Sequence, residues 1–163
     1  MTAPPSPTPL IPAPEISVSQ WLNTDQDLSL AGLSGEVVVI EAFQMLCPGC
    51  VSHGLPQAQR VASTFGDDVV IIGLHTVFEH HDAMLPVSLK AFLYEYRISF
   101  PVGVDAYDRG DPTPITMRRY GLRGTPTLLA IDRGGHLRIH AFGQVDDLVL
   151  GAGIARLIDE TYP

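Results

Sequence analysis

The feature that most constrains this sequence is an apolar run, Val37 to Phe43, which is broken only by Glu41 and precedes a pair of cysteines. The run is rich in β-branched residues, a pattern typical of a strand buried on both faces of a parallel or mixed sheet. A second run of this kind covers residues 69–74. Between the two runs, apolar residues recur at steps of three and four as far as Phe65, which predicts a helix. The sequence therefore predicts a sheet whose strands alternate with helices.

The rest of the chain continues this alternation. Apolar stripes and turn residues predict, in chain order, a loop over 76–85, a helix over 87–96, a strand from 100, a short helix from 114, strands over 125–131 and 137–142, and a helix over 146–159. Thr113 is expected to cap the short helix, with Pro114 in its first position. This order indicates the α/β class, with a mixed central sheet flanked by helices on both faces.

Composition indicates one globular domain behind an N-terminal arm. Residues 1–14 hold six prolines, which predicts an extended arm, either a tether or a strap, and residues 15–163 are expected to form the domain. The formal charge of −8 argues against nucleic acid or anionic lipid as a partner. No run approaches the roughly 18 apolar residues of a membrane span, and no signal peptide is visible. We therefore expect a cytoplasmic protein, or an exported one if the N-terminus was trimmed.

Cys47 and Cys50 form the strongest chemical signal, because they enclose Pro48 and Gly49 where a strand gives way to a helix. Amide dipoles converge at a helix start and stabilise a Cys47 thiolate, which is the attacking species in disulfide exchange. Cys50 lies one turn further on and is expected to be the less exposed, resolving thiol. The alternative is half of a structural zinc site, but such a site needs four ligands and there is no second cysteine pair.

Glu41 adds a second constraint, because a carboxylate buried in a strand is costly unless it has a task or a partner. The alternation of side chains places it on one face of the strand, near the strand's end and below the dithiol. We interpret it as the proton acceptor for Cys50 when a mixed disulfide resolves. The alternative is a strand-end glutamate that turns to solvent.

Thr125 and Pro126 open a later strand, where a proline cannot donate to the ladder. A cis bond between them would turn the chain sharply and lay the Thr125 backbone beside the dithiol. That backbone could then pair with an incoming substrate chain as an added strand does.

These residues resemble the thioredoxin fold, and more narrowly the TlpA/ResA-like branch of thiol–disulfide oxidoreductases. The resemblance covers roughly residues 15–160 and rests on Cys-x-x-Cys after a buried strand and on Gly-Thr-Pro-Thr over 124–127. It implies that Cys47 is the nucleophile, Cys50 the resolving thiol and Pro126 the family's cis-proline. Glu41 stands where thioredoxins proper place a buried acid.

The resemblance also implies what the site binds and where it departs from the family. Thr125, Pro48 and Gly49 are implied as the substrate-binding surface, and no cofactor or metal is implied beyond the dithiol. The implied partners are a disulfide-containing protein and an electron donor that the sequence does not identify. Leu46 stands where the family usually has Trp, and the order Pro-Gly replaces Gly-Pro. Pro56 lies one residue further from Cys50 than the family's helix proline.

The sequence thus predicts an oxidoreductase that reduces protein disulfides by dithiol exchange, and three alternatives stay open. The first is a peroxiredoxin-like peroxidase, although Gln44 stands where that class usually has Thr. The second is a metal-binding or chaperone module that uses both cysteines, and the third is a structural domain whose dithiol is incidental.

The polar group of His75, Glu79, His80, His81 and Asp82 is interpreted as a loop and not as a metal site. His53 is interpreted as an exposed helix histidine, with electrostatic tuning of the thiols as its alternative.

Overall fold

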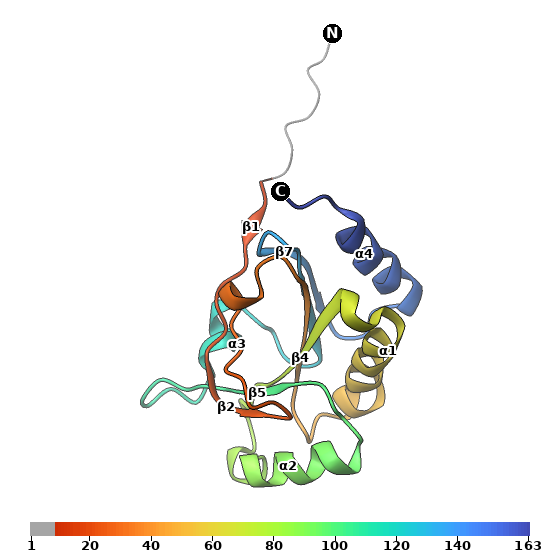
Figure 1. Ribbon diagram of the computed structural model, residues 1–163. Helices are drawn as coiled ribbons and strands as arrows, with labels where there is room; N and C mark the ends of the chain where they lie inside the picture. The colour runs from red at the N-terminus through yellow and green to blue at the C-terminus, as the bar shows by residue number, and fades with distance from the viewer. Residues whose placement is uncertain (1–8) are drawn as a thin grey trace.

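The computed structural model describes residues 9–163 (Figure 1). The expected arm over 1–14 therefore lies largely outside the described residues. The strands are β1 (Ile11–Pro12), β2 (Val18–Leu22), β3 (Val37–Phe43), β4 (Val69–His75), β5 (Val102–Asp105), β6 (Thr127–Ile131) and β7 (His136–Phe142). The helices are α1 (Leu55–Phe65), α2 (Pro86–Glu95), α3 (Ile115–Arg119) and α4 (Asp147–Asp159), with a π-turn η2 (Cys50–Gly54) and short 3-10 turns η1 (Ala31–Leu33), η3 (Gly66–Asp68) and η4 (His81–Ala83). Within this range no helix combines the length and apolar character needed to cross a membrane.

The strands form one mixed sheet in the order β1-β7-β6-β3-β4-β5-β2. β3, β4 and β5 run parallel, whereas β6 and β7 add an antiparallel hairpin beside β3. β3 is buried along its whole length because it lies at the centre, between β4 and β6. The predicted α/β class with a mixed sheet is confirmed.

Side chains of β3 alternate between two cores, one on each face of the sheet. Val37, Val39 and Phe43 pack with apolar residues of α1, α2 and α4. Val38, Ile40 and Ala42 face the other core, which α3 and the N-terminal segment cover. In Figure 1, α1 and α4 lie on one side of the sheet and α3 on the other. Glu41 is in step with Val39 and Phe43, so it points toward the face that α1 and α4 cover.

The N-terminal segment supplies both edges of the sheet. β1 pairs with β7, and β2 pairs with β5 at the opposite edge, both antiparallel. The residues between β1 and β2 cross the face that carries α3. There the Tyr120 hydroxyl donates to the Pro14 carbonyl at 2.5 Å, and the Ser17 N–H donates to Thr116 Oγ1 at 2.8 Å. The described part of the predicted arm therefore lies on the domain as a strap.

The prediction that Thr113 caps α3 is wrong. The helix begins at Ile115, with Pro114 preceding it in an extended conformation and no side-chain cap from its own flank. The buried carboxylate of Asp105 accepts hydrogen bonds from the N–H groups of Thr116 and Met117 at 2.9 and 3.0 Å. A residue at the end of β5 thus accepts the free N–H groups of the first turn of α3, a tertiary contact that local sequence does not indicate.

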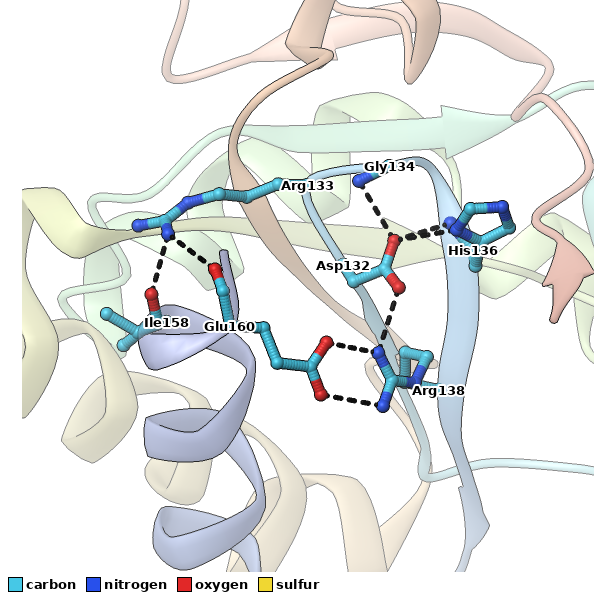
Figure 2. A network of polar contacts seen from close by, with 7 residues as sticks. All are labelled: Asp132, Arg133, Gly134, His136, Arg138, Ile158 and Glu160. Atoms are coloured by element: carbon cyan, nitrogen blue, oxygen red, sulfur yellow. Dashed lines mark hydrogen bonds and ion pairs between the residues drawn. The ribbon is translucent and has the colours of Figure 1, made fainter. Parts of the chain in front are cut away.

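A polar network fastens the end of α4 to the turn between β6 and β7 (Figure 2). Asp132 accepts from the N–H groups of Gly134 and His136 at 3.0 and 2.9 Å, which shapes the predicted hairpin turn. Arg138 bridges Asp132 and Glu160, at 3.0 Å and 2.5–2.8 Å respectively. This network holds α4 against the sheet and lies apart from the cysteines in the fold.

Candidate active site

The two cysteines follow β3 and form a disulfide. Their Cα atoms lie 5.2 Å apart, and the Cys50 N–H points at Cys47 Sγ with a distance of 3.2 Å. Cys47 is half-buried and Cys50 is fully buried, so solvent and a substrate reach Cys47 first. An N–H directed at Cys47 Sγ would stabilise a thiolate there in the reduced form. The two sulfurs therefore have the unequal access that dithiol exchange requires.

The helical segment that carries Cys50 contains the π-turn η2 directly before α1. A π-turn accommodates one more residue than an α-turn, because its hydrogen bonds join residues five apart. This extra residue accounts for the position of Pro56, one residue further from Cys50 than the resemblance implies, and it brings Pro56 into the first turn of α1. The departure in sequence thus coincides with a local departure from α-helical geometry.

Glu41 is 1% exposed, which excludes the alternative of a glutamate turned to solvent. Burial raises the pKa of this carboxyl well above its ordinary value. Its Oε1 has no hydrogen-bond partner among the described residues. A Cβ built on Gly54 would stand 2.2 Å from Glu41 Oε1 and 2.8 Å from Pro126 Cβ, so Glu41, Pro126 and the π-turn meet at one place.

The peptide bond between Thr125 and Pro126 is cis. The Thr125 carbonyl oxygen lies 3.5 Å from Cys47 Sγ, and Thr125 itself is half-buried. Gly49 packs against the Pro126 ring: a Cβ at Gly49 would lie 3.3 Å from Pro126 Cδ. Pro48 is exposed beside it. The structure therefore brings the residues that the resemblance assigns to substrate binding to one surface around Cys47.

Two polar side chains hold the loop between β3 and Cys47, and the sequence did not single either out for this. The buried His75, at the end of β4, accepts the Met45 N–H at Nε2 at a distance of 3.3 Å. Gln44 is also buried, and its Oε1 accepts the Phe78 N–H at 3.2 Å. Burial lowers the pKa of His75 to about 4, so the imidazole is neutral at pH 7 and can accept. The signal for His75 was its place at the end of an apolar run.

The surface next to the dithiol combines apolar side chains with one cation. Leu46, the residue that replaces the family's Trp, is 58% exposed. Phe142 is also exposed, and its ring contacts Gly124, directly before Thr125. The Arg123 guanidinium lies 5.5 Å from the centre of the Phe142 ring. The rim of the site is therefore open at Leu46 and amphipathic at Phe142.

His75, at the end of β4, and His81, in the loop that follows, are not brought together. The His81 ring lies 2.9 Å from the Pro112 carbonyl and is tilted against the ring of Tyr107, whereas His75 is buried at the dithiol loop. Among residues 9–163 no group of three or more His, Cys, Asp or Glu side chains is arranged to hold a metal ion.

Comparisons with known proteins agree with this site. No protein-family model matches the chain. The chain is 59% identical to a thioredoxin-like superfamily protein of known crystal structure, over 94% of this chain and 99% of that one, with a TM-score of 0.91. It is 50% identical to a thiol-disulfide isomerase from Corynebacterium glutamicum, over 94% of this chain and 97% of that one, with a TM-score of 0.87.

Curated sequences give more distant matches. The chain is 27% identical to the thiol:disulfide interchange protein DsbE of Allochromatium vinosum, over 93% of this chain and 77% of that protein. It also matches NHL repeat-containing protein 2 of Gallus gallus, with 37% identity over 97 residues, and spans 13% of that protein's length. The resemblance inferred from the sequence is confirmed by the full-length relatives, the fold and the paired cysteines. The chain therefore belongs to the thioredoxin-like superfamily of thiol–disulfide oxidoreductases.

Proposed function

We propose that this chain reduces disulfide bonds in protein substrates in a reducing compartment such as the cytoplasm, with its own dithiol as the electron carrier. The observation that carries the proposal is the unequal access of the two paired sulfurs, half-buried at Cys47 and buried at Cys50. The full-length thiol-disulfide isomerase relative supports the reaction class. A second dithiol protein would restore the reduced form.

The reaction proceeds in two exchanges. The Cys47 thiolate attacks one sulfur of the substrate disulfide, the S–S bond breaks, and the other substrate sulfur leaves as a thiolate. Cys50 then loses its proton to Glu41, and its thiolate attacks Cys47 Sγ. The Cys47–Cys50 disulfide forms, and the second substrate sulfur leaves reduced. Two electrons have passed to the substrate, and a donor dithiol returns them.

The surface around Cys47 provides the substrate-binding part of the proposal. The backbone of Thr125 lies beside Cys47 Sγ and can pair with an extended substrate segment. Gly49 packs on Pro126 and has no side chain that would obstruct a substrate there. The exposed Leu46 offers an apolar contact for residues that flank the substrate cysteine.

The test is a single-turnover assay of a disulfide-bonded protein with the pre-reduced chain. We expect Cys47→Ser to abolish reduction and Cys50→Ser to accumulate a mixed disulfide through Cys47. Turnover by Cys47→Ser at the rate of the unchanged chain would overturn the proposal. The reduction potential, measured against glutathione, checks the proposed direction, since about 30 mV changes the equilibrium tenfold for this two-electron couple.

No particular residue supports either the peroxidase alternative or the metal-binding alternative. Gln44, at the position that distinguishes a peroxidase, uses its carboxamide to accept the Phe78 N–H. The metal-binding alternative requires further ligands near the cysteines, and the described residues provide no such group. Rapid peroxide consumption by Cys47, or zinc or copper retained through desalting, would restore the respective alternative.

A further inference from the structure

A cavity of about 280 Å³ lies between the π-turn and the start of α4, with Glu41 among its walls. Its lining includes Glu41, His53, Gly54, Gln57, Asp146 and Asp147. Glu41 is buried, whereas His53, Asp146 and Asp147 are exposed, so the cavity extends from beside the buried Glu41 to the surface. A polar space of this size has room for several water molecules, since each needs roughly 30 Å³.

The π-turn shapes this cavity. Gly54 has no side chain, and a methyl group there would stand 2.2 Å from Glu41 Oε1. The glycine therefore lets the Glu41 carboxyl lie against the backbone of the π-turn, beside the cavity. Oε1 has no protein partner among residues 9–163, and a buried carboxyl oxygen without a partner is normally satisfied by water.

Most other polar groups of the cavity are already paired. Asp147 binds Arg60 at 3.0 Å and Gln57 Nε2 at 2.8 Å, and Gln57 Nε2 also donates to the Val145 carbonyl at 2.8 Å. Asp146 caps α4 by accepting the N–H groups of Leu148 and Val149. The charged and titratable groups that face the cavity are thus Glu41, His53, Arg60, Asp146 and Asp147, and Arg60 and the aspartates are engaged.

His53 is the group at the outer wall that is suited to carry a proton. Its Nδ1 lies 2.7 Å from Ser52 Oγ, and no further hydrogen bond of this ring is found among the described residues. An imidazole ring can both accept and donate a proton, and a ring exposed to solvent can pass that proton to water. The proposed reaction leaves a proton on Glu41 after each turnover, and this proton has to reach solvent before the next.

We propose that this cavity is the proton outlet of the dithiol site, in which water connects Glu41 to His53 and His53 exchanges the proton with bulk solvent. The inference rests on the proposed function, because it needs Glu41 to receive the Cys50 proton. The proton passes from the Glu41 carboxyl to water, from water to the neutral His53 ring, and from the imidazolium to solvent, so each group returns to its starting state.

The test separates the two exchanges in a rapid-mixing experiment with a fluorescently labelled, disulfide-bonded peptide. The Cys50→Ser variant reports formation of the mixed disulfide alone, and the full dithiol reports release of the reduced peptide. We expect His53→Gln to leave the first step unchanged and to slow release roughly tenfold at neutral pH. This is less than the rate factor that a side chain acting directly as general acid or base contributes. Added imidazole should restore the rate, because the cavity admits a molecule of that size.

His140→Gln is the matched control, since His140 is an exposed histidine on β7 outside the cavity. The pH profile of release should change in His53→Gln and stay that of the unchanged chain in His140→Gln. Equal rates and profiles in the two variants, or a slow His53→Gln that imidazole does not accelerate, would overturn the proton outlet. Failure of Cys50→Ser to trap peptide would instead overturn the proposed function, and the outlet with it.

Discussion

Two buried titratable side chains lie near the dithiol, and burial shifts them in opposite directions. It raises the pKa of Glu41 and lowers that of His75 to about 4. In both cases the cause is the loss of hydration of the charged form, so the fold favours the neutral form of each. The raised pKa makes the Glu41 carboxylate a stronger base, as acceptance of the Cys50 proton requires, whereas the neutral His75 ring accepts the Met45 N–H.

Glu41→Gln should increase the free energy of unfolding at pH 8 relative to the unchanged chain. Because the folded pKa is raised, the folded chain holds a proton that the unfolded chain releases above about pH 4.5. Stability conferred by this group is thus complete below that pH and is lost as the pH rises toward the folded value. Urea unfolding at pH 5 and pH 8 measures the difference in stability between Glu41→Gln and the unchanged chain, which should widen with pH. Release of substrate should be slower in the variant. A constant difference across this range would contradict the assignment.

His75→Gln should make the protein less sensitive to acid. Between its ordinary pKa of 6.5 and its folded pKa of about 4, the unfolded chain binds a proton that the folded chain does not. Stability is therefore lost as the pH falls through this window, by roughly 3 kcal/mol in total for a shift of this size. Glutamine keeps an acceptor for the Met45 N–H but does not titrate. Parallel stability–pH curves for the two proteins would contradict the prediction.

The sequence revealed Glu41 but not the role of His75. Glu41 was visible because it interrupts an apolar strand, and burial follows from the strand being central. His75 lies where a strand ends, and the polarity of the residues after it suggested that the strand ended at Leu74. Its contact with Met45 depends on β3 and β4 being in register, with Phe43 opposite His75, which one sequence does not specify.

At the scale of elements, the π-turn is the feature that the sequence patterns did not predict. The strands from β3 onward, the hairpin and α4 follow from apolar patterns and turn residues, and their bounds agree with the predictions to within a few residues. The π-turn needs a tertiary cause, the close approach of Gly54 to Glu41 and Pro126. Asp105 at the first turn of α3 is a second contact of this kind.

Gly54→Ala should lower the stability by about 1–3 kcal/mol, because the added methyl group would be overpacked against Glu41 and Pro126. Gly151→Ala, in the interior of α4 with no heavy atom within 4 Å of the new Cβ, is the control. It should raise the stability by about 0.5–1 kcal/mol, since alanine favours the helix. Thermal or urea unfolding compares the two variants, and changes of the same sign would refute this account of the π-turn.

At the scale of the whole molecule, the N-terminal segment closes both edges of the sheet. β7 would otherwise present unpaired N–H and C=O groups at one edge, and β5 at the other. The prolines near the N-terminus predicted an arm, and pairing at Ile11–Pro12 could not be foreseen because the partner strand lies at the far end of the sequence.

A chain that begins at residue 15 should keep disulfide exchange and gain a tendency to self-associate. The dithiol follows the central strand β3, away from β1, whereas removal of β1 exposes the edge of β7. Light scattering over a range of concentrations measures the association. A full-length Ile11→Ser variant is the control, because it keeps the backbone pairing and loses the exposed apolar side chain. An unchanged monomer in the shortened chain would contradict the edge-covering role.

This arrangement also bears on synthesis. Ile11 pairs with Leu137, so β1 cannot dock until the more than 120 residues that separate it from its partner have left the ribosome. β2 reaches its partner earlier, once residues 102–105 are made. The nascent chain is thus expected to secure one edge of its sheet well before the other, because the β1–β7 pairing must wait for residues 136–142.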